Sequence, residues 1–152
     1  MMMVSENLKN MAKNLAKEAP RSPSIRLGGY AILSRTIDKC RAAILNQNGE
    51  YHFDCPMDKT LFSFKKITGD QFRSFVEQGK TDDEVLDWLN KNGEKKNVKQ
   101  IKEWSDSVEN DYYYKKPDKK EWFASECERL GLNPETTTLF DYLNADDKAS
   151  FN

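Results

Sequence analysis

Residues whose side chains could do chemistry concentrate in residues 21–58. His52 and Cys55 stand three positions apart there, and a Cys–His pair is the minimal set for a nucleophile and its base. Cys55 also precedes a proline that suits the first turn of a helix, where amide donors and the helix dipole favour a thiolate. Asp54 and Asp58 place negative charge nearby and oppose thiolate formation. Two interpretations stay open, a catalytic thiol and a small buried cysteine beneath a helix cap.

A second candidate site combines a glycine pair with cationic side chains. The glycines can bring backbone amides close to a ligand, although the spacing of a phosphate-binding loop is absent. In the helix expected to follow, two cations flank one carboxylate opposite an apolar stripe, and such a set suits an anionic ligand. The candidate ligand-binding residues are Gly28, Gly29, Tyr30, Arg35, Asp38, Lys39, Arg41 and Asp58.

Each of these residues also has a structural interpretation. A tight turn accounts for the two glycines, Tyr30 can fill the core, and an i, i+3 pair of Arg35 with Asp38 is typical of a solvated helix face. Arg41 borders the apolar stripe and must find an acceptor, because a buried unpaired charge is too costly. Alternatively, Arg41, Asp38 and Asp58 form a buried ion network that holds the glycine loop against the helices.

The elements that must position these residues are helical almost throughout. Apolar residues recur at helical spacing behind capping residues, and no run of alternating β-branched residues is long enough for a sheet. Helices are expected behind Ser5 as far as Pro20, from Ser34 to about Asn46, from Asp54–Pro56, behind Thr68, Thr81 and Asn97, from Asp118 to Gly131, and from Asn133. The predicted fold is all-α, an irregular bundle of about seven to eight short helices with little or no sheet. It forms a single domain over residues 1–152, in which residues 1–20 are loosely attached to a domain over 21–152.

Aromatic clusters outside residues 21–58 give weaker signals. Tyr112 to Tyr114, followed by two lysines, resembles a stacking patch for single-stranded nucleic acid, but acidic residues flank it. Trp88, Trp104 and Trp122 each fall on the apolar stripe of an expected helix, which predicts that all three lie in the core.

Composition limits the classes of partner. The 152 residues include 24 Lys+Arg and 25 Asp+Glu, for a net charge of −1, which argues against a general nucleic-acid binder. The charges are unevenly placed, with eight basic and four acidic residues in 1–50 but seven basic and twelve acidic ones in 101–152. A local anion site in the basic part is compatible with this distribution.

Membrane, secretory and metal-binding signals are missing from the sequence. No window approaches the ~20 apolar residues of a membrane span, and residues 1–13 lack the apolar run of a secretory signal, so we expect a cytoplasmic protein without a membrane partner. Cys40, Cys55 and Cys127 are widely spaced and accompany a single histidine, whereas a structural zinc site needs four closely spaced ligands. Reduced thiols, no metal and no cofactor are therefore expected.

Several short motifs occur together in this chain. They are R-S-P at 21–23, L-G-G-Y at 27–30, R-x-x-D-K-x-R-A at 35–42, Y-x-x-x-C-P-x-D at 51–58 and L-F-D-Y-L at 139–143. In combination they resemble a family of small bacterial proteins known as the domain of unknown function DUF5069, over about residues 21–151. The resemblance implies no activity, but it implies that the motif residues belong to one recurrent arrangement, structural or functional.

The function predicted from these features is that of a small binding or interaction module. Its pocket would lie between the glycine loop and the helix of residues 35–42, and its partner would be an anionic small molecule or an acidic protein segment. The alternative is a small enzyme in which Cys55 is the nucleophile, His52 is its base, and Arg35 or Arg41 fixes an anionic substrate.

Overall fold

Helices supply the regular structure of residues 5–151, the part of the chain that the computed structural model describes. They are α1 (Glu6–Met11), α2 (Leu33–Ile44), α3 (Pro56–Lys65), α4 (Gly69–Val76), α5 (Asp82–Lys91), α6 (Val98–Glu109), the 3₁₀ turn η1 (Tyr113–Lys115), α7 (Lys120–Leu130) and α8 (Leu139–Ser150). An isolated bridge between Leu27 and Tyr30 is the only β-type pairing in this part of the chain. The predicted all-α, single-domain fold is confirmed for these residues, while residues 1–4 and 152 of the predicted domain lie outside them.

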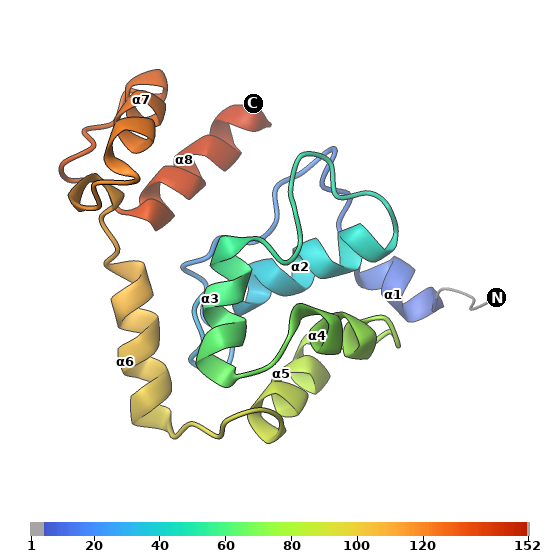
Figure 1. The fold of residues 1–152 in the computed structure, drawn as a ribbon. Coiled ribbons are helices and arrows are strands. Elements are labelled where there is room, and N and C mark those ends of the chain that lie inside the picture. Colours follow the sequence, from blue (N-terminus) through green and yellow to red (C-terminus); the bar gives the residue numbers. More distant parts are fainter. Residues whose placement is uncertain (1–4, 152) are drawn as a thin grey trace.

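Helix α2 runs through the middle of the main body, with α3 and α4 packed beside it (Figure 1). Every residue from Leu33 to Ala42 is buried. The expectation of a solvated face on this helix is therefore wrong, because other segments cover both sides. The neighbouring helices cover the apolar stripe. On the polar side, the 20–25 segment supplies an arginine and α8 supplies a carboxylate.

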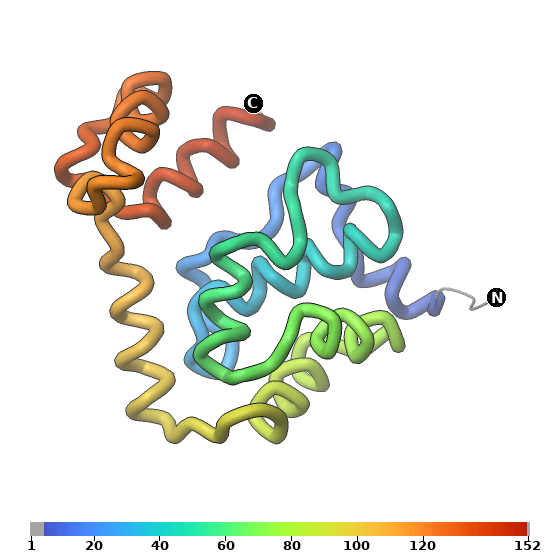
Figure 2. The backbone as a smooth tube through the Cα atoms, viewed as in Figure 1, coloured from blue at the N-terminus to red at the C-terminus, as the bar shows by residue number. Residues whose placement is uncertain are grey.

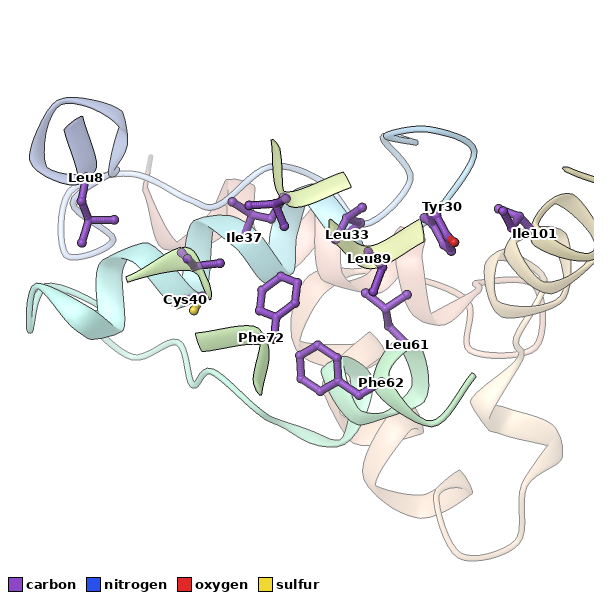
Figure 3. Close-up of a cluster of buried hydrophobic side chains, with 12 residues drawn as sticks. Leu8, Tyr30, Leu33, Ile37, Cys40, Leu61, Phe62, Phe72, Leu89 and Ile101 are labelled. Atoms are coloured by element: carbon purple, nitrogen blue, oxygen red, sulfur yellow. The ribbon is translucent and has the colours of Figure 1, made fainter. Parts of the chain in front are cut away.

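The apolar stripe of α2 forms the centre of the main core. Leu33, Ile37 and Cys40 are fully buried in one cluster with aromatic and aliphatic side chains from α3, α4 and α5. Figure 3 shows this cluster along α2, from Leu8 at one end to Ile101 at the other. Leu8 has no exposed surface, so α1 is attached to the main body through this side chain.

Capping residues place several helix starts where the sequence predicts them. Thr68, Thr81 and Asn97 each accept a hydrogen bond from the amide three residues later, and the side chain at that later position bonds back to the cap amide. These reciprocal bonds satisfy two amides that a helix start leaves without partners. They depend on local sequence alone, which explains why the prediction succeeds.

Other boundaries differ from the prediction because tertiary contacts determine them. Helix α2 begins at Leu33 behind Ile32, which has φ 75° and donates its amide to the Pro23 carbonyl, so Ser34 is not the cap. Helix α1 ends at Met11 instead of continuing toward Pro20, and the Leu15 amide bonds to the Gln47 carbonyl.

The remaining shifts occur at the starts of α3, α7 and α8. Cys55 replaces Asp54 as the residue before α3, and α7 starts at Lys120, two residues after the predicted Asp118. The segment from Asn133 forms a turn, and Thr138 caps α8 instead. Among these three starts, only that of α8 has a strong side-chain cap, because Thr138 accepts a hydrogen bond from the Asp141 amide, whereas Cys55 and Lys119 make no such bond.

The C-terminal helices form a second apolar cluster. Phe123 and Cys127 of α7 are buried with Leu139 and Tyr142 of α8. Helix α6 connects this pair to the main body, and α8 then runs back toward the loop of residues 46–55 (Figure 2). No helix among residues 5–151 is long and apolar enough to cross a membrane.

Tyr30 gives the fold a predicted sensitivity to alkaline pH. Burial raises the pKa of Tyr30 to about 12, whereas an unfolded chain titrates tyrosine near 10. The stabilisation is complete below about pH 10 and is lost as the pH rises to about 12, because the unfolded state releases the proton first. Urea unfolding should therefore show a fall in unfolding free energy over this window that is shallower in Tyr30→Phe. Equal slopes in the two proteins would contradict the assignment.

Candidate functional site

The glycine loop is fixed against α5 and α6. Gly28 and Gly29 both have positive φ, 58° and 87°, and a Cβ atom at Gly28 would overlap the Leu86 side chain. The Gly29 carbonyl accepts a hydrogen bond of 2.7 Å from Ser105, and the buried Tyr30 hydroxyl points to α5. The loop therefore packs on its neighbours in the way that the tight-turn interpretation predicts.

Asp38 and Arg41 belong to one ion network on the side of α2 near α5. The Arg21 guanidinium lies between two carboxylates, 3.0 Å from Asp38 Oδ1 and 2.7 Å from Asp82 Oδ2. Arg41 contacts the same Asp82 at 3.1 Å and donates to the Lys80 carbonyl at 3.0 Å. Burial would raise the pKa of Asp82, but the hydrogen bonds and charges of the two arginines outweigh it and lower the pKa. Arg41 thus has the acceptors that it was expected to need at its terminal nitrogens, whereas its buried Nε has no hydrogen-bond partner among the described residues.

Lys39 and Asp58 form a separate buried pair between α2 and α3. Lys39 Nζ lies 3.0 Å from Asp58 Oδ2, and both side chains are buried. The Thr36 hydroxyl donates to Asp58 Oδ1 at 2.6 Å, and the Asp54 amide donates to Oδ2 at 2.9 Å. The carboxylate therefore caps α3 and neutralises a lysine of α2 at once.

Arg35 pairs with α8 instead of with its helix neighbour Asp38. Its guanidinium makes two hydrogen bonds to Asp147, at 2.7 and 3.2 Å. The Tyr51 hydroxyl donates to the same carboxylate at 2.7 Å, and the Arg35 guanidinium lies 5.5 Å from the centre of the Tyr51 ring. The expected i, i+3 pair is wrong because Arg21 occupies Asp38 and Asp147 reaches Arg35.

A cleft of about 810 Å³ separates α8 from α2, α3 and the 46–55 loop. One wall consists of Leu139, Leu143, Asp146 and Ser150, which share a face of α8. The opposite wall consists of Arg35, Lys39, Cys55, Pro56, Met57 and the 49–52 segment. Trp122 and Phe151 stand at the rim, 50% and 37% exposed. The prediction that Trp122 lies in the core is wrong, since it packs beside Tyr142 with half its surface in solvent.

The predicted ligand-binding residues thus separate into different environments. Arg35 and Lys39 line the cleft, and Asp58 lies directly behind Lys39. Asp38 and Arg41 line a smaller hollow of about 510 Å³ beside Thr81 and Asp82. Gly28, Gly29 and Tyr30 line neither hollow, because their contacts are with α5 and α6.

Both candidate catalytic residues line the cleft, but they are not hydrogen-bonded to each other. The Cys55 sulfur accepts a hydrogen bond of 3.1 Å from Lys39 Nζ, and none links it to His52 in the described part of the chain. An ammonium that donates to the sulfur is not a base for it. Across residues 5–151, no group of three or more His, Cys, Asp or Glu side chains is placed to hold a metal ion.

Sequence reasoning missed the partners that organise these residues. Arg21 appears only within a motif, and neither Asp82, which follows the predicted cap Thr81, nor Asp147 was a candidate site residue. Arg21 and Asp38 are 17 positions apart, and the other pairs are separated by 41 to 112 positions. Local spacing carries no signal for such pairs.

The fold and the cleft define an all-α protein whose central helix is held by buried ion pairs and whose C-terminal helix forms one wall of an open cleft. The chain belongs to the family described as Domain of unknown function (DUF5069), whose model matches residues 17–149. This match covers the motif residues of α2, the Cys55 segment and nearly all of α8. None of the curated proteins compared with the chain matches it.

Proposed function

We propose that the protein is a binding module for a small molecule, and that the cleft beside α8 is its site. The supporting observation is the size and lining of this cleft, about 810 Å³ with apolar and aromatic walls. Sites for small molecules fall in this range of volume and combine an apolar lining with a few polar groups. The cleft lies between α8, which belongs to the second cluster, and residues of α2, α3 and the 46–55 loop, as many ligand sites lie between packed units.

The walls favour a ligand with an apolar, aromatic portion. Trp122 and Phe151 expose ring surface at the rim, and Leu139, Leu143 and Met57 line the walls behind them. Aromatic side chains give large contact area with a preference for stacked or edge-on rings. A planar ring system between these walls would bury the exposed aromatic surface.

The polar side chains of the cleft argue against the strongly anionic ligand that the sequence predicts. Arg35 and Lys39 supply positive charge, but each is already paired with a carboxylate, at 2.7 Å and 3.0 Å. An anion would have to compete with Asp147 and Asp58 for these donors. We therefore favour an aromatic ligand whose polar group is neutral or weakly charged over a phosphate.

Thermal-shift and ligand-detected NMR experiments with neutral heteroaromatic fragments, inorganic phosphate and nucleotides test this proposal. We expect neutral aromatic fragments to bind, and Trp122→Ala to weaken them about three- to tenfold, the equivalent of one aromatic contact. Trp122 is half exposed, so the substitution leaves the core intact.

Ile25→Ala is the matched control, because Ile25 is 47% exposed and does not line the cleft. Fragment affinity should be unchanged in this variant. Binding by phosphate alone, or fragment binding that Trp122→Ala and Ile25→Ala affect equally, would exclude the cleft as the site of an aromatic ligand.

The thiols support the predicted cytoplasmic compartment. All three cysteines are free, and Cys40 and Cys127 are buried. Burial raises the pKa of both buried thiols, which keeps them protonated and inert. Free cysteines without disulfides are typical of proteins in reducing compartments.

A further inference from the structure

We propose that the C-terminal half of α8 is a hinged wall of the cleft, held closed by Asp147 and able to open without unfolding either apolar cluster. The opening would control access to the site, and in this respect the inference rests on the proposed function. The motion itself follows from how unequally the two halves of α8 are held.

The first turn of α8 is anchored by apolar burial. Phe140 is 1% exposed and packs in a cluster with Ala31 and Ile32, the residues that lead into α2. Leu139 and Tyr142 are buried in the second cluster with α7. Moving this turn would expose Phe140, which packs against the residues before α2, and Tyr142, which packs against α7. The first turn is therefore the fixed end of α8.

The last two turns of α8 are held mainly by polar contacts. From Leu143 to Phe151, Asp147 is the only buried residue, and Lys148 to Phe151 are all exposed. Asp147 accepts hydrogen bonds from Arg35 and from Tyr51, and these bonds join this half of α8 to the main body. Toward α7, Asp146 accepts a hydrogen bond of 2.7 Å from Arg129, and Leu143 packs against the second cluster. The Phe151 ring adds one stacked contact with Tyr51, 6.5 Å between ring centres. We call the three residues Arg35, Tyr51 and Asp147 the clasp.

A polar clasp suits a wall that opens. When it separates, water can solvate the guanidinium and the carboxylate, which offsets part of the lost ion pair. Separation of the anchored end would offer no such compensation, because apolar side chains gain nothing from water. The cleft-facing residues Leu143, Asp146 and Ser150 all lie on the half that the clasp holds, so release of the clasp widens the cleft.

Cys55 is a natural reporter of this opening. It lines the cleft opposite α8, and it is the one cysteine of the three that is not buried. Cys40 lies in the main cluster and Cys127 in the second cluster. The rates at which a bulky maleimide labels the three thiols, followed by peptide mass spectrometry, therefore separate cleft opening from unfolding of either cluster.

Tyr51→Phe removes one hydrogen bond to a charged group and keeps the ring. We expect Cys55 labelling to accelerate about tenfold, because the open fraction rises by the factor that such a bond represents. Asp147→Asn removes the charge that Arg35 requires and should accelerate Cys55 labelling at least as much. Cys40 and Cys127 should remain as slow as in the natural protein.

Tyr142→Phe is the matched control. Tyr142 also donates to a carboxylate, Glu126 at 2.6 Å, but this bond joins α7 to α8 within the second cluster. Cys55 labelling should be unchanged in this variant. Unaltered Cys55 labelling in both clasp variants, or acceleration of all three cysteines together, would overturn the hinged wall. No ligand is used, so a failure of fragment binding leaves this result standing, and the reverse also holds.

Discussion

Asp58→Asn should lower the free energy of unfolding by about 3–5 kcal/mol, the usual consequence of removing one partner of a buried ion pair. The Asp58 carboxylate is fully buried and accepts from Lys39, Thr36 and the Asp54 amide. An asparagine keeps the size but has one acceptor oxygen, and its amide group would face a donor. Lys39 would then hold a buried charge without a counter-charge.

Urea and thermal unfolding measure this loss, and two further variants show its origin. Asp87→Asn is the matched control, because Asp87 pairs with Lys91 on an exposed surface and its loss should change stability far less. Lys39→Met in the Asp58→Asn background should restore part of the stability, since the orphaned charge is gone. A small effect of Asp58→Asn, or a double variant no more stable than the single one, would show that the pair is not the source of stability.

Arg21→Met should produce a loss of similar size, about 3–5 kcal/mol. Arg21 is the ion-pair partner of Asp38, whose carboxylate is 2% exposed and receives hydrogen bonds from the Arg21 amide, Nε and Nη2. Methionine replaces the aliphatic stem and leaves Asp38 buried with the amide alone. Asp82 would retain Arg41, so the main penalty falls on Asp38.

Arg129→Met tests whether burial, and not ion pairing alone, causes the loss of stability expected for Arg21→Met. Arg129 also bridges two carboxylates, Glu126 at 3.0 Å and Asp146 at 2.7 Å, but its side chain is 48% exposed. Its removal should have a much smaller effect, because water solvates the carboxylates that remain. Equal losses for Arg21→Met and Arg129→Met in urea unfolding would contradict the view that burial makes the Arg21 network essential.

These two results bear on the meaning of the sequence motifs. Asp38 and Arg41 belong to the R-x-x-D-K-x-R-A motif, and Asp58 ends the C-P-x-D motif. Their contacts hold α2 against the 20–25 segment, α5 and α3. Large losses of stability would show that these positions have a structural role. Arg35 and Lys39 of the same motif line the cleft and stay candidates for ligand binding.

Local sequence determined the helical character of this protein and several helix boundaries. The Thr81–Glu84 and Asn97–Gln100 boxes are complete within four residues, so no distant contact is needed to form them. Helical spacing of apolar residues likewise predicted an apolar stripe on the helix after the glycine pair, and the core buries Ile37 and Cys40 of that helix. The sequence also placed Cys55 near a helix start. It indicated that Arg41 needs an acceptor but did not identify which residue supplies it.

Only the tertiary structure decided which charges meet and where the cleft lies. Arg35 could have paired with Asp38 three positions away, yet it pairs with Asp147, 112 positions along the chain. Burial of both sides of α2 causes the difference, because a charge removed from water must take the partner that the surrounding segments supply. The sequence by itself determined the net charge of −1 and the helices. The packing of α8 against the main body created the cleft, since its walls come from segments that no local pattern connects.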